Sequence, residues 1–288
     1  MKDSFAISND QFALCGNKIR IPMLGWVEMT ETLRFEGKVL GAVISRRADH
    51  WYVSIQVEMP DPKPIHETHG ENQAVGVDLG VKDLAALSDG TKVAGAKPHK
   101  ALLSRLRRLN KSLSRKQGAK KDEKKSKNFI KEKRKLARLH AKIANIRNDE
   151  AHKLTTNLTR SYSIIGVEDL NVLGMVKNKK LARSVLDASF FEFRRQLEYK
   201  AKITGSKVVA ANMFYPSSKL CSSCGFKLEE LDLSAREWRC PDCHALHDRD
   251  INAAINLRNN AVSYTVSACQ DFLETISSAK QELNTNTG

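Results

Sequence analysis

The sequence contains no run of about 18 or more apolar residues, the length that a membrane-spanning helix requires. Its beginning, Met-Lys-Asp-Ser-Phe-Ala-Ile-Ser-Asn-Asp, also lacks the apolar core of a secretory signal peptide. These absences argue against membrane and secreted proteins and predict a cytoplasmic location. Cysteines stay reduced in that compartment, so the 6 cysteines are expected as thiols rather than as a disulfide framework.

Acidic residues are also scarce relative to basic ones. The sequence has 33 Asp and Glu and 48 Lys and Arg, which gives a net charge of +15. Residues 97–147 hold 20 Lys and Arg but only 3 acidic residues. The rest of the chain holds 28 Lys and Arg and 30 acidic residues. Leucines and isoleucines recur there at helical spacing in two sets, which predicts a basic helical hairpin within residues 97–160. Solvated helix faces ordinarily mix both signs of charge, so this asymmetry favours contacts with nucleic-acid phosphates. The residues expected to make these contacts are Arg105, Arg107, Arg108, Arg115, Lys116, Lys133, Arg134 and Arg138.

Four of the cysteines follow the pattern C-x2-C, 15 residues, C-x2-C. This spacing places two pairs of thiols on two short turns, and four thiolates form the tetrahedral shell that zinc prefers. Two disulfides, or four unrelated buried cysteines, are the alternative interpretations. The pattern predicts a zinc site with the ligands Cys221, Cys224, Cys240 and Cys243.

Three acidic residues lie at the ends of predicted elements. Asp78 lies in an apolar run predicted as a buried strand, Glu168 ends a second such run, and Asp250 begins a predicted helix. Magnesium prefers carboxylate oxygens, and two such ions about 4 Å apart can activate a water and stabilise the leaving oxygen of a phosphodiester. Spacing alone does not show that the acids meet, and a strand-end Asp bonded to nearby amides is the alternative. Asp248 competes with Asp250 for the third position.

The predicted elements follow the order in which an RNase H-like sheet is assembled. Strands at 74–80, 162–170 and 207–212 alternate with a hairpin and with helices, the last of them short and at 251–259. A surface loop is expected at 171–184, and Ser189 with Glu192 forms a capping box that begins a further helix.

Several motifs in this order resemble the TnpB family, OrfB-type proteins of insertion sequences that are related to compact type V CRISPR effectors. The resemblance covers roughly residues 18–257 and includes Leu106-Arg-Arg-Leu of the hairpin. Its most specific motifs are Gly76-Val-Asp-Leu-Gly80, Val167-Glu-Asp-Leu170, Tyr215-Pro-Ser-Ser-Lys-Leu-Cys-Ser-Ser-Cys-Gly225 and His247-Asp-Arg-Asp-Ile-Asn-Ala-Ala254.

The resemblance implies an RNA-guided DNA endonuclease that is associated with DNA transposition, with a guide RNA from the transposon end and a target DNA as partners. It places the catalytic acids at Asp78, Glu168 and Asp250, which would bind magnesium, and the zinc ligands at the four clustered cysteines. The expected fold is α/β, with an RNase H-like (RuvC-type) mixed sheet, a helical-hairpin insertion, a zinc-ribbon insertion and a small N-terminal β domain. The expected domains are a partial β-barrel-like (wedge-type) domain at 1–60, a linker at 61–73, the RuvC-like core at 74–214, the zinc ribbon at 215–247, the last RuvC-like motif with its helix at 248–274, and a disordered tail at 275–288.

Members of this family usually have a longer N-terminal region, so the sequence also predicts a shortened chain. A nucleic-acid-binding remnant that does not cleave is therefore an alternative function. An actin-like ATPase is a third, because Gly-Val-Asp-Leu-Gly resembles its phosphate loop, although a second glycine-rich nucleotide loop is missing from the sequence.

Overall fold

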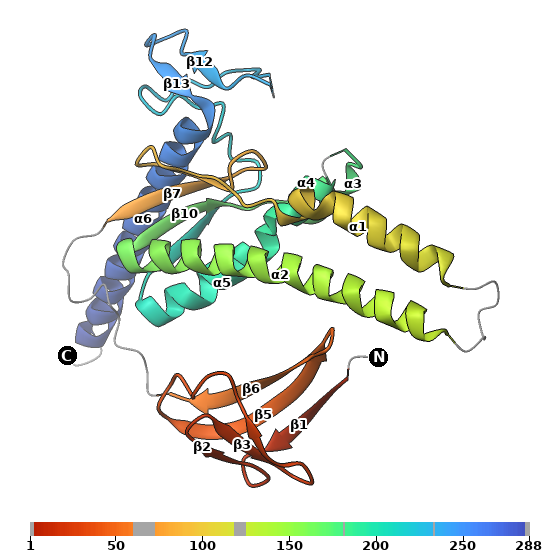
Figure 1. The fold of residues 1–288 in the computed structure, drawn as a ribbon. Helices are drawn as coiled ribbons and strands as arrows, with labels where there is room; N and C mark the ends of the chain where they lie inside the picture. Colours follow the sequence, from red (N-terminus) through yellow and green to blue (C-terminus); the bar gives the residue numbers. More distant parts are fainter. Residues whose placement is uncertain (1–2, 60–72, 118–124, 181, 233, 286–288) are drawn as a thin grey trace. The chain divides into compact units, whose positions relative to one another are not determined.

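The computed structural model describes residues 3–59, 73–117, 125–180, 182–232 and 234–285 (Figure 1). The chain divides into two compact units, one formed by Met1–Pro62 and Ala101–Asn145 and the other by Lys63–Lys100 and Ile146–Gly288. The linker predicted at 61–73 lies almost entirely outside the described residues. No helix in the described part of the chain combines the length and the apolar composition that crossing a membrane requires.

The first unit contains two small antiparallel sheets of three strands each. One has the order β1 (Ser4–Ser8), β5 (Lys38–Arg47), β6 (His50–Glu58), and the other has the order β2 (Ala13–Cys15), β3 (Lys18–Ile21), β4 (Gly25–Glu28). Alternate residues along the strands point inward, and the isoleucines at positions 7, 19, 21 and 44 form a buried cluster with Ala42. The sequence predicts β3 to β6, whereas the mostly exposed strands β1 and β2 lack the alternation that would reveal them.

The predicted helical hairpin is present as α1 (Pro98–Arg115) and α2 (Lys127–Ser161). Their apolar seam buries Leu106, Leu139 and Ile143 in one cluster, as the helical spacing predicts. Most of the link between the two helices lies outside the described residues.

A five-stranded mixed sheet forms the centre of the second unit. Its order is β11 (Lys207–Ala211), β10 (Ile164–Glu168), β7 (Ala74–Leu79), β8 (Ala85–Leu87), β9 (Lys92–Val93). The strands β11, β10 and β7 are parallel, whereas β8 is antiparallel to β7 and β9 is antiparallel to β8. The mixed α/β architecture that the sequence predicts is therefore confirmed.

The two faces of this sheet differ because side chains alternate along a strand. Val75 and Val77 of β7 pack with Leu158 of α2 and with Leu197 of α5 (Phe190–Thr204) on one face. The glycines of the same strands lie on the opposite face, against helix α6 (Arg249–Thr285), which crosses β7 and β10 in Figure 1.

Helix α6 approaches the sheet so closely that only glycine fits beneath it. A Cβ atom added to Gly76 would lie 1.8 Å from the carbonyl oxygen of Ala254, and one added to Gly166 would lie 2.3 Å from that of Leu257. The backbone of the helix therefore rests directly on strands β7 and β10.

Three sequence predictions in this unit were wrong. The expected loop at 171–184 contains helix α3 (Val172–Lys177), capped by the Asn171 side chain, and the start of α4 (Ala182–Ala188). Ser189 does not cap α5, because it has a left-handed backbone (φ 54°) directly after α4, and its hydroxyl donates back to the carbonyl of Leu186. Helix α6 extends past the predicted 251–259 to Thr285, since neither glycine nor proline occurs between Arg249 and that residue.

Gly166→Ala is expected to lower the free energy of unfolding by about 3 kcal/mol, because α6 would have to move away from the added Cβ. Guanidinium denaturation followed by circular dichroism measures this change. Gly95→Ala is the matched control, since the nearest atom to its Cβ would be the Cβ of Leu84 at 3.4 Å. Equal effects of the two substitutions would contradict the close packing.

Candidate active site and metal centre

Two of the predicted catalytic acids lie on neighbouring parallel strands. Asp78 is near the end of β7 and Glu168 ends β10, and the pairing of Val77 with Val167 puts them at the same level of the sheet. Because side chains alternate, Asp78 shares a face with Gly76, and Glu168 shares a face with Gly166. Both carboxylates are therefore on the face that helix α6 covers.

The third acid comes from helix α6 itself. Asp250 lies in its first turn, one helical turn before Ala254, whose carbonyl is placed above Gly76. Burial raises the pKa of Asp78 well above its usual value, and the negative charges of Glu168 and Asp250 raise it further. The three predicted acids thus interact, although they are far apart in the sequence.

A lysine that the sequence analysis did not identify lies beside these acids. The Nζ atom of Lys92, on the edge strand β9, is 2.7 Å from Oδ2 of Asp248 and 3.8 Å from Oδ2 of Asp250. The same Asp248 accepts hydrogen bonds of 3.1 Å from the backbone amides of Asp250 and Ile251, so it caps helix α6. Although burial opposes the shift, the hydrogen bond from Lys92 and these amides hold the pKa of Asp248 below its usual value.

These contacts distinguish the two rivals for the third acidic position. Asp248 is engaged by the helix terminus and by Lys92, whereas the charge of Asp250 acts on Asp78. The geometry therefore favours Asp250 over Asp248 as the partner of Asp78.

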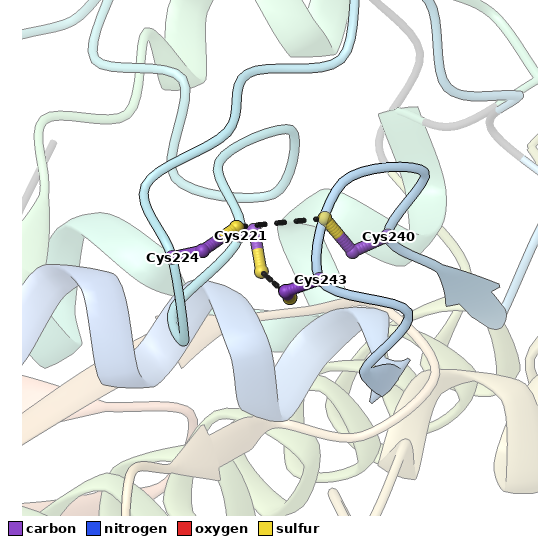
Figure 2. A group of neighbouring side chains, drawn as sticks. All are labelled: Cys221, Cys224, Cys240 and Cys243. Carbon is purple, nitrogen blue, oxygen red and sulfur yellow. Dashed lines mark hydrogen bonds between the residues drawn. The ribbon is translucent and has the colours of Figure 1, made fainter.

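The four predicted zinc ligands lie together at the tips of two turns (Figure 2). Their sulfur atoms all lie within 4.8 Å of one another, and the distances between Cys221 and Cys243 and between Cys224 and Cys240 are both 3.6 Å. Thiolates about 2.3 Å from a tetrahedral zinc ion lie about 3.8 Å apart, so the cluster fits that ion. All four cysteines are free, which excludes the disulfide interpretation.

Local structure explains why the cysteines converge. The amide of Gly225 donates to the carbonyl of Cys221 at 2.9 Å, and the amide of His244 donates to that of Cys240 at 3.0 Å, so both pairs form similar turns. Gly225 and His244 both have positive φ, of 80° and 58°. The antiparallel strands β12 (Glu237–Arg239) and β13 (Leu246–Asp248) flank the second turn.

A histidine contacts the cluster, and the sequence analysis did not predict this contact. Nε2 of His247 lies 3.0 Å from the sulfur of Cys221, and its ring packs against Trp238 with centroids 4.8 Å apart. Burial opposes ionisation of the Cys221 thiol, but backbone amides of the turn and His247 lower its pKa to about 6. Thiolate is the form that binds metals, so the surroundings of Cys221 favour a ligand.

Of the residues that the structure describes, only the four cysteines form a group of three or more potential ligands close enough to hold one metal ion. The carboxylates of Asp78, Glu168 and Asp250 interact through their charges but are not drawn together to that degree. The structure therefore supports a structural zinc site directly, and a magnesium site is a proposal.

All eight basic residues predicted to contact phosphates are exposed on the hairpin. Within the first unit, Arg138 pairs with Asp49, and Lys116 pairs with Glu132 at 3.3 Å. The other six form no ion pair with any residue in the described ranges. They are Arg105, Arg107, Arg108, Arg115, Lys133 and Arg134.

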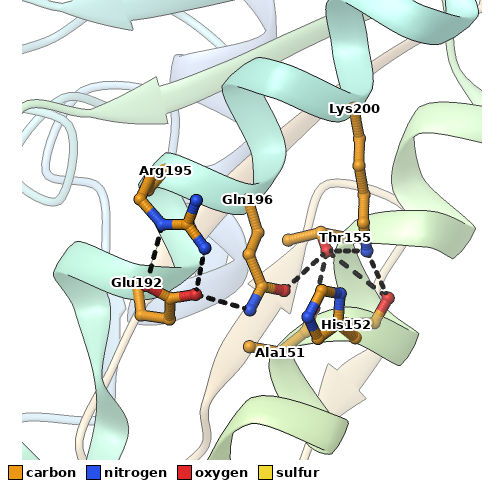
Figure 3. A network of polar contacts seen from close by, with 7 residues as sticks. All are labelled: Ala151, His152, Thr155, Glu192, Arg195, Gln196 and Lys200. Carbon is orange, nitrogen blue, oxygen red and sulfur yellow. Dashed lines mark hydrogen bonds and ion pairs between the residues drawn. The ribbon is translucent and has the colours of Figure 1, made fainter. Parts of the chain in front are cut away.

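A polar cluster in the second unit joins helices α2 and α5 (Figure 3). Nζ of Lys200 donates to the hydroxyls of Thr155 and Thr156 at 2.8 and 2.7 Å and to the carbonyl of His152 at 2.8 Å. Glu192, which would have completed the capping box, instead accepts hydrogen bonds from Arg195 and Gln196. The polar groups of these residues satisfy one another's hydrogen-bonding capacity. The cluster therefore holds the two helices together and is not the candidate site.

Comparison with known proteins shows two family matches that together include the sheet, the hairpin and the cysteine cluster. A family model described as "Probable transposase" (OrfB_IS605) matches residues 54–179, and one described as "Cas12f1-like, TNB domain" matches residues 190–257.

Two curated relatives are similar over most of this chain. A "Putative RNA-guided DNA endonuclease" of Streptomyces pristinaespiralis is 41% identical over 225 residues, which are 78% of this chain and 53% of that protein. The "Putative RNA-guided DNA endonuclease InsQ" of Escherichia coli is 35% identical over 281 residues, which are 92% of this chain and 67% of that protein. The chain thus spans between about half and two thirds of the length of these relatives.

A solved structure, the cryo-EM structure of a Cas12f1-sgRNA-target DNA complex, shares the fold. Its TM-score is 0.52 at 19% sequence identity, and the match covers 76% of this chain and 45% of that one. This likeness supports the architecture alone.

Cys240→Ser is expected to abolish zinc binding and to unfold the ribbon around the cluster, because the buried sulfur of Cys240 is one of its four ligands. Metal analysis of the purified chain should give about one zinc per wild-type molecule and much less for the variant. Limited proteolysis should cut the variant between the two cysteine pairs. Cys15→Ser is the control, since that exposed thiol lies outside the cluster, and an equal loss of zinc there would contradict the assignment.

Asp78→Asn is expected to stabilise the chain in the absence of magnesium, by on the order of 1 kcal/mol at pH 8, because the wild-type carboxyl must ionise in a buried, negatively charged place. A raised pKa in the folded state means that the wild type loses stability relative to the variant as the pH rises above about 4. Denaturation at pH 5, 6.5 and 8 without added magnesium measures the difference. A difference that does not grow with pH would contradict the coupling of Asp78 to its neighbours.

Proposed function

Because this chain belongs to the TnpB family of OrfB-type insertion-sequence proteins, we propose that it is an RNA-guided DNA endonuclease that hydrolyses phosphodiester bonds at Asp78, Glu168 and Asp250. The observation that supports this most is that two parallel strands and one helix bring these acids to one face of the sheet, where the charges of Glu168 and Asp250 act on Asp78. The names of the curated relatives and the association of the family with DNA transposition agree with it.

The proposal extends to the organisation of the chain. The central sheet with helix α6 would be a RuvC-type, RNase H-like nuclease core, formed by residues 74–214 and 248–274. Residues 215–247 would be a zinc ribbon inserted before its last acidic motif, and residues 1–60 would be a wedge-type domain.

The three carboxylates would hold magnesium, most simply as two ions, since hard divalent cations prefer carboxylate oxygens. When bound, these ions would activate a water and stabilise the leaving oxygen of the phosphodiester. Asp78 must give up its proton for this role, and the nearby positive charges of Arg249 and Lys92 favour its ionised form. Lys92 also forms an ion pair with Asp248, which caps helix α6.

The basic hairpin would bind nucleic-acid backbones. Six of its exposed basic residues are free of described ion pairs, and phosphate contacts of this kind hold a duplex without reading its sequence. In RNA-guided recognition the guide reads the target by base pairing, so a guide RNA and a target DNA are the partners that this surface fits. Cas12f1, whose fold is similar, was solved with an sgRNA and target DNA.

Asp250→Ala is expected to reduce cleavage of a matched DNA target by about a thousandfold or more, because one of three metal-binding carboxylates is removed. The assay uses the purified chain with the guide RNA of its transposon end and with magnesium. Zinc content and RNA binding should stay unchanged, because Asp250 lies outside the cysteine cluster.

Asp248→Ala is the matched comparison. It should destabilise the start of α6 by about 1 kcal/mol through the lost cap, while reducing cleavage much less. A larger loss of cleavage in Asp248→Ala than in Asp250→Ala would make Asp248 the third acid. RNA binding by the wild type without cleavage, beside an active longer relative, would leave nucleic-acid binding as the function of this chain.

A further inference from the structure

A buried hydroxyl lies beside one of the proposed metal ligands. The Oγ atom of Ser217 donates a hydrogen bond to Oε1 of Glu168 at 2.5 Å, and Ser217 is only 4% exposed. The terminal torsion of a glutamate side chain is broad, so a carboxylate rotates readily unless a neighbour holds it. Ser217 is thus placed to select one orientation of the Glu168 carboxylate.

Helix α6 holds the backbone of Ser217 in place. The side-chain amide of Asn256 donates to the carbonyl of Ser217 at 2.8 Å and to the carbonyl of Leu220 at 2.6 Å. The hydroxyl of Tyr215 in turn donates to the backbone carbonyl of Asn256 at 3.3 Å. The segment before the first cysteine pair is therefore bound to the helix by two side chains, that of Asn256 from the helix and that of Tyr215 from the segment.

A second asparagine, one turn earlier on the helix, binds the cysteine turn itself. Asn252 donates to the carbonyl of Leu220 at 2.7 Å and accepts from the backbone amide of Ser222 at 2.9 Å. Asn252 and Asn256 are 1% and 3% exposed and lie on the same face of α6, four residues apart. The turn that contains Cys221 is consequently fixed to the helix whose first turn presents Asp250.

Stability alone accounts for part of this arrangement, since buried amides must find hydrogen-bond partners. The hydroxyl of Ser217 differs, because its acceptor is a proposed metal ligand and not a backbone group. Groups that hydrogen-bond a ligating carboxylate orient it and strengthen the metal site.

We propose that Ser217 is a positioning residue for Glu168, and that Asn256 fixes it relative to the helix that presents Asp250. The cysteine turn, held by Asn252, completes the connection, so the zinc-binding segment helps to set the relative placement of the two carboxylates. This inference rests on the proposed function, in which the carboxylates bind divalent cations.

Ser217→Ala tests the proposal, because it removes the hydroxyl while adding no volume. Binding of Mn²⁺ to the full chain is measured by titration calorimetry, and the site is defined as the binding that Asp78→Asn removes. The expected result is about tenfold weaker Mn²⁺ binding, with unchanged zinc content and melting temperature. Ser218→Ala is the matched control, since its side chain forms no hydrogen bond with the described residues, and its Mn²⁺ affinity should equal that of the wild type.

Asn256→Asp tests the second part of the inference. The substitution conserves the shape but places an oxygen opposite the carbonyls of Ser217 and Leu220, so the Ser217 segment should shift. Mn²⁺ binding should again weaken about tenfold. The double variant with Ser217→Ala should be about as weak as either single variant, because both act through one hydroxyl.

The outcomes separate this inference from the proposed function. Wild-type Mn²⁺ affinity in Ser217→Ala overturns the positioning role, and additive effects in the double variant overturn the role of Asn256. A chain that binds Mn²⁺ in this Ser217-dependent way but does not cleave DNA contradicts the nuclease proposal alone. A wild type without Mn²⁺ binding overturns both.

Discussion

The structure depends on the close approach of helix α6 to the central sheet. Gly76 and Gly166 let the helix backbone rest directly on strands β7 and β10, at a distance that any Cβ atom would prevent. The alternation of side chains then puts Asp78 and Glu168 on the same face as these glycines, next to the first turn of the helix. One packing contact therefore determines both the layering of helix and sheet and the placement of the three acids on one face of the sheet.

Bringing three carboxylates together costs free energy, because burial and like charges both disfavour ionisation. The raised pKa of Asp78 records this cost. Lys92 compensates part of it from the edge strand β9, and Asp248, its ion-pair partner, also caps the helix that contains Asp250. The neighbourhood of the acids is thus arranged around negative charge that a divalent cation would neutralise, which is why their function is proposed to be metal-dependent.

The cysteine cluster is connected to this site through hydrogen bonds as well as through the chain. His247, which contacts the sulfur of Cys221, directly precedes the Asp248 cap, and Asn252 and Asn256 bind the segment around the first cysteine pair. A structural zinc site normally contributes folding energy to its own small domain. Here the same segment also contacts Glu168 through Ser217, which is the basis of the proposed link between the zinc-binding segment and the geometry of the acids.

Local patterns in the sequence were sufficient wherever a structure is decided by neighbours in the chain. The cysteine spacing predicted the cluster, and the helical spacing of leucines predicted the seam of α1 and α2, because a turn or a helix face involves residues only a few positions apart. The capping box at Ser189 failed, since helix α4 ends just before it and its hydroxyl bonds backward.

The contacts of Lys92 and Ser217 were not predicted from the sequence for another reason: their acidic partners lie 156 and 49 residues away in the chain. The sequence by itself determined the zinc ligands, the hairpin and the identity of the candidate acids. Only the tertiary structure decided that these acids lie on one face of the sheet and which residues contact them, because the packing of α6 on the two glycines joins parts of the chain that no spacing relates.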